Sequence, residues 1–161
     1  MIEVPSTPRV PAEDLARILN DARRRTAELT EDVANERPYG PNLQIVNPLL
    51  WEVGHVGFFH DYFALRQLYG LAAYRMPEAE SLYDSSAIAH DDRWELPLPT
   101  MARTRDYLTD VHNAMLARLP DGGAASEAQS YVYQLTTFHE DMHGEAFFWT
   151  RQTLADSPPA L

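Results

Sequence analysis

The chain has 161 residues, of which 45% are hydrophobic and 23% charged, the size and composition of one globular domain with a buried core. Its 24 acidic residues outnumber the 13 lysines and arginines, and the formal net charge of −11 argues against nucleic-acid binding, which needs a basic face. The absence of cysteine excludes disulfides, thiolate metal sites and a cysteine nucleophile. The sequence shows neither a signal-peptide pattern nor an apolar run near the ~20 residues of a membrane span, so we expect a cytoplasmic protein without a membrane partner.

The first half of the chain predicts an N-terminal arm followed by two helices. Residues 1–10 hold two prolines and no hydrophobic periodicity, which is typical of an extended arm. Apolar residues three and four apart predict a helix over about 11–35, up to a break rich in proline and glycine. A second helix is predicted over 47–69, with Asn47 as its N-cap and Gly70 as its stop.

Two glycines, Gly54 and Gly57, lie inside this second predicted helix. A glycine in a helix interior costs up to about 1 kcal/mol relative to alanine. We therefore expect these positions to allow a close approach, either of a neighbouring backbone or of a ligand.

The second half of the chain predicts a long loop and two more helices. Residues 71–99 show no clear period, but their apolar and aromatic side chains indicate an ordered loop that packs over the helices. Apolar spacing predicts helices over about 100–119 and 126–154. Thr100 and Ser126 are the expected N-caps of these helices.

Together these elements predict an all-α fold, a four-helix bundle over residues 11–155 with a long ordered loop between its second and third helices. No segment predicts a strand of any length. We interpret residues 156–161, which hold two prolines, as a linker or a cut end. In such a bundle, facing helices supply metal ligands to the core.

The fourth predicted helix carries His139 and His143. Residues four apart lie on one helix face, about 5–6 Å apart at Cβ, so both imidazoles can reach one metal ion. Two histidines on a wet surface would show the same spacing. Apolar residues around the pair favour a buried site, where histidines need partners. The residues that we interpret as this apolar surrounding and core stripe are Tyr131, Leu135, Phe138, Met142, Phe147, Phe148 and Trp149.

His55 lies between the two glycines of the second predicted helix. Trp51, Phe58, Phe59 and Tyr62 are on or beside the same face, which points His55 inward. A lone inward histidine is more often a hydrogen-bonded core residue than a ligand, so the residues alone leave both interpretations open. As a ligand, His55 would complete a three-histidine site with room for water or substrate.

Three motifs, in this order, resemble the DinB-like domain that opens the ergothioneine-type sulfoxide synthases, or hercynine oxygenases, which are non-haem iron enzymes. Residues 48–55, PLLWEVGH, are similar to the family's SPxxWHxGH helix, and residues 138–145, FHEDMHGE, to its HxxxHxE. The stretches 82–85 and 93–100 are similar to the loop between the family's second and third helices. The resemblance covers nearly the whole chain.

This resemblance implies a DinB-like bundle in which His55, His139 and His143 hold iron(II), with zinc or nickel as alternatives. It implies a small-molecule thiol or selenol, a histidine-derived betaine such as hercynine, and O₂ as substrates. No catalytic side chain beyond the ligands is assigned. The residues expected to support the ligands or to lie near the substrate are Glu145, Trp51, Arg93 and Tyr62.

Two departures from the family pattern bear on function. Members of the family continue into a large formylglycine-generating-enzyme-like domain with a tyrosine important in catalysis, whereas this chain stops at Leu161, where the linker would begin. We therefore expect such a domain as a partner, fused or separate. The family's arginine-rich loop, which holds the thiol's carboxylates, is shorter here and keeps only Arg93, which leaves the thiol or selenol open.

Three other interpretations remain at this point. Residues 139–143 also satisfy the HExxH pattern of zinc proteases, with Glu140 as general base, although no histidine follows His143 as a third ligand. A stand-alone DinB-like protein would instead be a thiol S-transferase or metal-dependent hydrolase that uses zinc or nickel. A bundle with a structural metal site would be a non-catalytic partner module.

Overall fold

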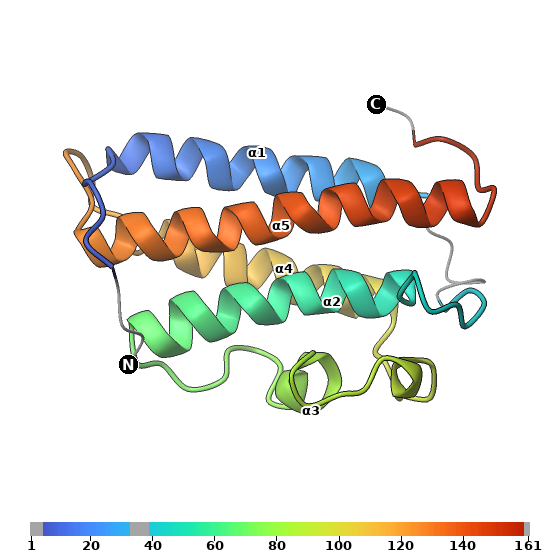
Figure 1. Cartoon of the computed structure of the whole chain (residues 1–161). Helices are drawn as coiled ribbons and strands as arrows, with labels where there is room; N and C mark the ends of the chain where they lie inside the picture. The colour runs from blue at the N-terminus through green and yellow to red at the C-terminus, as the bar shows by residue number, and fades with distance from the viewer. Residues whose placement is uncertain (1–4, 33–38, 160–161) are drawn as a thin grey trace.

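The computed structural model in Figure 1 describes residues 5–32 and 39–159, and within these ranges the protein is all-α, as the sequence predicts. Backbone pairing of the β type is limited, in the described part of the chain, to one isolated bridge between Pro11 and Ala124. None of the helices described is both long and apolar enough to cross a lipid bilayer. The four long helices are α1 (Ala12–Thr30), α2 (Leu49–His60), α4 (Met101–Leu116) and α5 (Glu127–Thr153).

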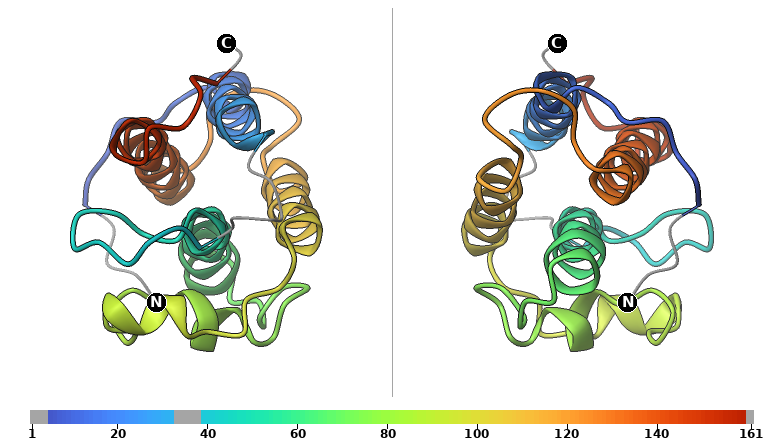
Figure 2. Two further views of the ribbon diagram at one scale, coloured as in Figure 1. Left: turned by 90° about the vertical axis from the view of Figure 1, so that its right-hand side faces the viewer. Right: turned by 90° about the vertical axis from the view of Figure 1, so that its left-hand side faces the viewer.

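These four helices surround one core, seen end-on in Figure 2. Helix α1 packs mainly on α5, while α2 packs on both α4 and α5 and lies on the loop-covered side of the bundle. The predicted end of the first helix near Asn35 lies outside the described residues. The largest fully buried apolar side chains are Trp51, Tyr83, Tyr133, Phe147, Leu15, Leu19, Leu65, Met76 and Met115.

Two of the three predicted N-caps are confirmed. The hydroxyl oxygens of Thr100 and Ser126 each accept a hydrogen bond from the backbone N–H three residues later. The prediction for Asn47 is wrong, because Pro48 occupies the N-cap position of α2 and makes no side-chain cap. The Asn47 Oδ1 atom instead accepts a hydrogen bond from Arg93 Nη1 at 2.6 Å, so a loop residue competes for the capping group.

The second predicted helix changes its winding halfway. After α2 the chain continues as a π-helix, η1 (Asp61–Leu68), and Gly70 ends it in the left-handed conformation with φ +68°, as predicted. The wider turn brings residues five apart together, and the buried Asp61 Oδ2 accepts hydrogen bonds from Arg66 Nε and Nη2 at 3.1 and 2.8 Å. The Tyr107 hydroxyl donates to the same oxygen, which ties η1 to α4.

The predicted loop over 71–99 is ordered and covers α2, but it contains two short helices, α3 (Ala79–Tyr83) and η2 (Asp91–Trp94). At five and four residues, both are too short to show a hydrophobic period in the sequence. The indole Nε1 of Trp51 donates to the Leu82 carbonyl oxygen at 2.8 Å, which fixes α3 against α2.

The two glycines of α2 admit neighbouring side chains, rather than the backbone or ligand that we expected. A Cβ atom on Gly54 would lie 2.2 Å from the ring of Tyr83, and one on Gly57 would lie 2.6 Å from Leu108 Cδ1. Both neighbours are buried, so neither can move aside without disturbing the core. The glycines therefore set the distance of α2 from α3 and α4.

The predicted core stripe of α5 is wrong for its most apolar members. Phe138 is 64% exposed, and Met142 and Trp149 are each 49% exposed. The buried face of α5 carries instead many polar residues, so the hydrophobic spacing identified the outer face of the helix. The polar or charged residues buried on α5 are Ser130, Thr136, Thr137, Glu140, His143, Thr150 and Arg151.

A pair of glycine substitutions tests this packing. We expect Gly54→Ala to destabilise the protein by about 1–3 kcal/mol, because the new methyl group overlaps the Tyr83 ring. Gly144→Ala on α5 is the matched control, since its Cβ would meet Leu29 Cδ1 at an ordinary 3.7 Å, and the helix propensity of alanine should stabilise by up to about 1 kcal/mol. Urea unfolding measures both changes; equal effects of the two substitutions would contradict the packing described.

Candidate metal centre

The structure brings the three predicted histidine ligands together. His55 comes from α2, and His139 and His143 come from successive turns of α5. Each offers one ring nitrogen, and these three atoms lie within 4.8 Å of one another. The ring centroid of His55 lies 5.1 Å from that of His139 and 5.0 Å from that of His143. Among the described residues this is the one cluster of its kind.

Hydrogen bonds orient two of these rings so that their Nε2 atoms are free. The Nδ1–H of His55 donates to the Tyr83 carbonyl oxygen at 2.8 Å, and the Nδ1–H of His143 donates to the buried Glu52 Oε1 at 2.7 Å. A carbonyl or carboxylate oxygen only accepts, so the proton of each neutral ring lies on Nδ1. A carboxylate behind a histidine is the usual way to fix a metal ligand and raise its basicity.

The geometry of the histidine pair fits a metal ion. His139 Nε2 lies 3.3 Å from His143 Nε2, although the His143 nitrogen carries no proton in the neutral ring. Two nitrogens about 2.1 Å from one tetrahedral ion would lie about 3.4 Å apart. Three neutral imidazoles suit iron, zinc and nickel alike, so the donor set does not choose among them.

Burial keeps two of the candidate ligands neutral. Desolvation is the main cause that lowers the pKa of His55 to about 4 and that of His139 to about 2. The neighbouring histidines add to this effect, because a second positive charge in the cluster is unfavourable. Near pH 7 both rings therefore offer lone pairs without first losing a proton.

Two of the predicted supporting residues form a stack behind His55. The Trp51 indole lies parallel to the His55 ring, with centroids 4.9 Å apart. The Arg93 guanidinium also lies over the indole ring, 4.0 Å from its centroid. Arg93 Nη1 also donates to Asn47, so the loop residue is held in place by both contacts. The stack fixes the orientation of His55 from the loop side.

Tyr62 packs against neighbouring aromatic rings of α2 and η1, and Phe59 lies directly against one of the histidines. Tyr62 packs against Phe58 and Phe63, with ring centroids 5.7 and 5.1 Å away. Phe59 stacks flat on His139, with centroids 3.5 Å apart. Phe59 is four residues after His55, so the helical spacing that pairs His139 with His143 also predicts this neighbour.

Glu52 is a site residue that the sequence interpretation missed. It is 1% exposed, and it links α2 to the His143 ring of α5 through the hydrogen bond described above. Its spacing of three residues before His55 places it near the same helix face. A glutamate in an otherwise apolar helix turn is the signal that could have identified it, since a buried carboxylate needs a partner.

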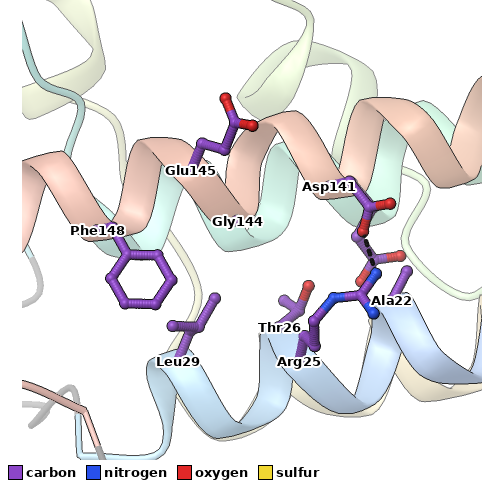
Figure 3. Close-up of a pocket in the computed structure, with 9 residues that line it drawn as sticks. Ala22, Arg25, Thr26, Leu29, Asp141, Gly144, Glu145 and Phe148 are labelled. Atoms are coloured by element: carbon purple, nitrogen blue, oxygen red, sulfur yellow. Dashed lines mark hydrogen bonds and ion pairs between the residues drawn. The ribbon is translucent and has the colours of Figure 1, made fainter. Parts of the chain in front are cut away.

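Glu145 lies on the exposed rim of a groove between α1 and α5, shown in Figure 3. It follows His143 by two residues, about 200° around the helix, so it faces away from the histidine cluster. In the same groove the Arg25 guanidinium reaches across from α1 to Asp141 at 2.5 Å. The groove is thus a contact between α1 and α5, and none of the three histidines lines it.

Glu140 is directed into the bundle and does not join the ligand cluster. Its carboxylate oxygens lie 3.3 Å from Arg23 Nε of α1 and 3.3 Å from His60 Nε2. In an HExxH protease the glutamate must reach water on the metal. Its engagement on α1 argues against that chemistry for this chain.

The side of the cluster nearest solvent is apolar. His139 is less buried than the other two ligands, and beside it on α5 the exposed Phe138 and Met142 follow the helix toward Trp149. Such a row of large exposed apolar side chains is unusual on a protein surface that faces water alone. The candidate centre therefore lies at the edge of an apolar surface.

Comparison with known proteins places this geometry in a family. The model of the DinB superfamily matches residues 14–147, which include all three histidines. The chain belongs to the DinB superfamily. This membership agrees with the all-α fold of the described residues.

Two curated relatives are both named hercynine oxygenase. The protein from Mycobacterium tuberculosis is 32% identical over 152 residues, which cover 91% of this chain and 34% of the relative. The protein from Mycolicibacterium thermoresistibile is 32% identical over 141 residues, 82% of this chain and 29% of the relative. The chain thus spans about a third of the length of these relatives.

The hydrogen bond from His143 gives a direct test of the centre. We expect Glu52→Gln to weaken binding of Zn²⁺ or Co²⁺ by about 10- to 100-fold, because the amide accepts from Nδ1–H without a negative charge. His143→Ala should abolish binding with little loss of helicity. Glu145→Gln, on the opposite side of α5, is the matched control and should bind like the wild type. Competition titration measures the affinities, and an unchanged affinity of Glu52→Gln would contradict this role.

Two further histidines are buried in the core outside the candidate centre. His60 is 0% and His112 8% exposed, and desolvation lowers their pKa values to about 3 and about 4. The Nε2–H of His112 donates to Asn20 Oδ1 at 2.8 Å, which joins α4 to α1. Both rings are therefore neutral in the folded protein at neutral pH.

The pH dependence of stability follows from these shifts. Unfolded histidines take up protons near pH 6.5, whereas the folded ones do so only near pH 4 or below, so the free energy of unfolding should fall as the pH drops from about 6.5 to about 4. His112→Gln should reduce the slope by up to about 1.4 kcal/mol per pH unit. Urea unfolding at pH 7, 6 and 5 measures this, and parallel curves for the two proteins would contradict it.

Proposed function

We propose that this chain is the metal-binding part of a non-haem iron(II), O₂-dependent sulfoxide synthase that joins a thiol or selenol to the imidazole of a histidine betaine. The observation that carries this proposal is the convergence of His55, His139 and His143 in a chain that is 32% identical to hercynine oxygenases over most of its length. Three ligands from two helices leave positions for substrates, as a catalytic site requires and a closed structural site does not.

Each residue would have a defined part in this function. His55, His139 and His143 would hold the iron, which supplies O₂ activation and a Lewis-acidic centre when bound. Glu52 and the Tyr83 carbonyl would keep the protons of two ligands on Nδ1 and so preserve the lone pairs on Nε2. Phe59 and Trp51 would cover ring faces of the ligands and exclude water from that side.

The substrate contacts would come largely from a partner. Arg93 already contacts Trp51 and Asn47, so its guanidinium is less available to bind the carboxylates of a thiol substrate. The apolar surface of Phe138 and Met142 beside His139 offers contact area but few polar groups that could orient two substrates. Since the chain spans about a third of its relatives, we propose that a formylglycine-generating-enzyme-like domain, fused or separate, completes the site.

A second candidate function is thiol transfer or hydrolysis at zinc or nickel by the same cluster. The specific observation in its favour is the all-nitrogen donor set with its 3.3 Å nitrogen–nitrogen distance, which fits zinc as well as iron. Anaerobic loading with iron(II), followed by O₂ and thiol, separates the two. Oxygen-dependent product supports the first function, and metal-dependent thiol transfer without O₂ supports the second.

The decisive measurement is product formation from hercynine, thiol, iron(II) and O₂, followed by mass spectrometry. We expect residues 1–161 alone to bind iron but to form negligible product, because positioning of the substrates can supply about 7–11 kcal/mol of barrier lowering. Product should appear when the partner domain is supplied. Robust turnover by the chain alone would contradict the need for a partner, and iron binding without product in either case would contradict the sulfoxide synthase assignment.

A further inference from the structure

A charged cluster lies inside the bundle beside the candidate metal centre. Glu140 of α5 is 1% exposed, and its Oε1 lies 3.3 Å from Arg23 Nε of α1. Its Oε2 lies 3.3 Å from the Nε2 of His60, the last residue of α2. The same Nε2–H donates to the Thr136 carbonyl oxygen of α5 at 3.0 Å. Three helices therefore meet at one buried carboxylate.

Burying such a charged cluster costs more free energy than filling the same space with apolar side chains. Taking a carboxylate and a guanidinium out of water costs several kcal/mol per ion, and apolar side chains of the same volume often stabilise a fold as well or better. The contacts of Glu140 are also longer than ordinary charge-assisted hydrogen bonds. Packing alone therefore does not explain why charged residues occupy these positions. A role in holding a neighbouring element in place would explain it.

The cluster contacts α5 at the level of its two candidate ligands, His139 and His143. Glu140 directly follows His139 and precedes His143, and the Thr136 carbonyl lies about one helical turn before His139. A rotation of α5 by about 10° would move a side-chain tip about 6 Å from the helix axis by about 1 Å. Metal–ligand distances tolerate only about 0.2 Å. The rotation of α5 must therefore be set more closely than apolar packing requires.

We propose that Glu140, held by Arg23 and His60, is a positioning residue that fixes the rotation of α5 and so aligns His139 and His143 for one metal ion. This assigns to the glutamate of the HExxH-like sequence a role at the core rather than at a metal-bound water. The inference rests on the metal centre of the proposed function. It also explains why the buried face of α5 is polar at the position between its two ligands.

Three variants separate positioning from packing. Glu140→Gln removes the charge. The double variant Arg23→Met with Glu140→Met removes both charges and keeps the volume, so it should fold at least as well as Glu140→Gln. Asp141→Asn is the matched control, because it disrupts the neighbouring contact between α1 and α5, made with Arg25 on the surface. Circular dichroism and urea unfolding establish the fold of each variant.

The readouts are Co²⁺ affinity, the visible absorption of the Co²⁺-loaded protein, and the ¹⁵N shifts of the imidazoles without metal. We expect Glu140→Gln and the double variant to lose at least about tenfold in Co²⁺ affinity and to change the absorption spectrum, and Asp141→Asn to match the wild type. A double variant with wild-type affinity and spectrum would overturn the proposal, since apolar packing would then suffice. So would peptide hydrolysis by the wild type that Glu140→Gln abolishes at unchanged affinity.

The metal-free measurement keeps the inference apart from the proposed function. If the wild type binds no Co²⁺, the proposed function fails, but the ¹⁵N shifts of His139 and His143 still report whether their alignment depends on the cluster. Altered shifts in the double variant, with those of Asp141→Asn unchanged, would support positioning by Glu140. Identical shifts in the wild type, the double variant and Asp141→Asn would overturn the proposal.

Discussion

The hydrogen bond between His143 and the buried carboxylate of Glu52 joins the two helices on which the candidate centre depends. Helix α2 is buried on nearly every side, since all of its residues from Leu49 to Phe58 are buried. A polar group on such a helix must find its partner within the protein. Glu52 finds His143 of α5, so a single contact engages one oxygen of the carboxylate, fixes the tautomer of the histidine and holds the two helices in register.

The same requirement explains the loop that covers α2. The polar atoms of Trp51 and His55 donate to the carbonyl oxygens of Leu82 and Tyr83 at the end of α3. These carbonyls are available because α3 ends there, and the last carbonyls of a helix have no partner within it. The absence of a side chain at Gly54 leaves room for the Tyr83 ring against α2. The loop therefore supplies acceptors to the site as well as apolar cover.

The sequence predicted the bundle because the helix signals are local. Proline, glycine and serine or threonine mark the ends of the long helices, and the periodicity of α1 and α4 marks their buried faces. It also predicted the three histidines as one set, because two are four apart on one helix and the third stands in a motif. Contacts between distant segments, such as Glu52 with His143 or Arg93 with Trp51, have no local pattern, so the sequence did not predict them.

Helix α5 shows why the prediction of its buried core stripe failed. Apolar periodicity predicts a buried face only when apolar packing decides which residues are inside, and here the inner face of α5 carries many charged, hydroxyl and histidine side chains instead. Glu140 and His143 are buried with protein partners, while Phe138 and Trp149 remain exposed. This inversion is typical of a functional site, where the local rule is violated and another interaction compensates for it.

The charge around the cluster limits the ligands that the centre would favour. Neutral imidazoles leave the charge of a divalent ion undiminished, and Glu52 offers its carboxylate to His143 rather than to the ion. Arg93 adds a further positive charge behind Trp51. Open positions beside such an ion would therefore favour an anionic donor such as a thiolate over a neutral one. The apolar surface next to His139 strengthens this preference, because charges attract more strongly where water is excluded.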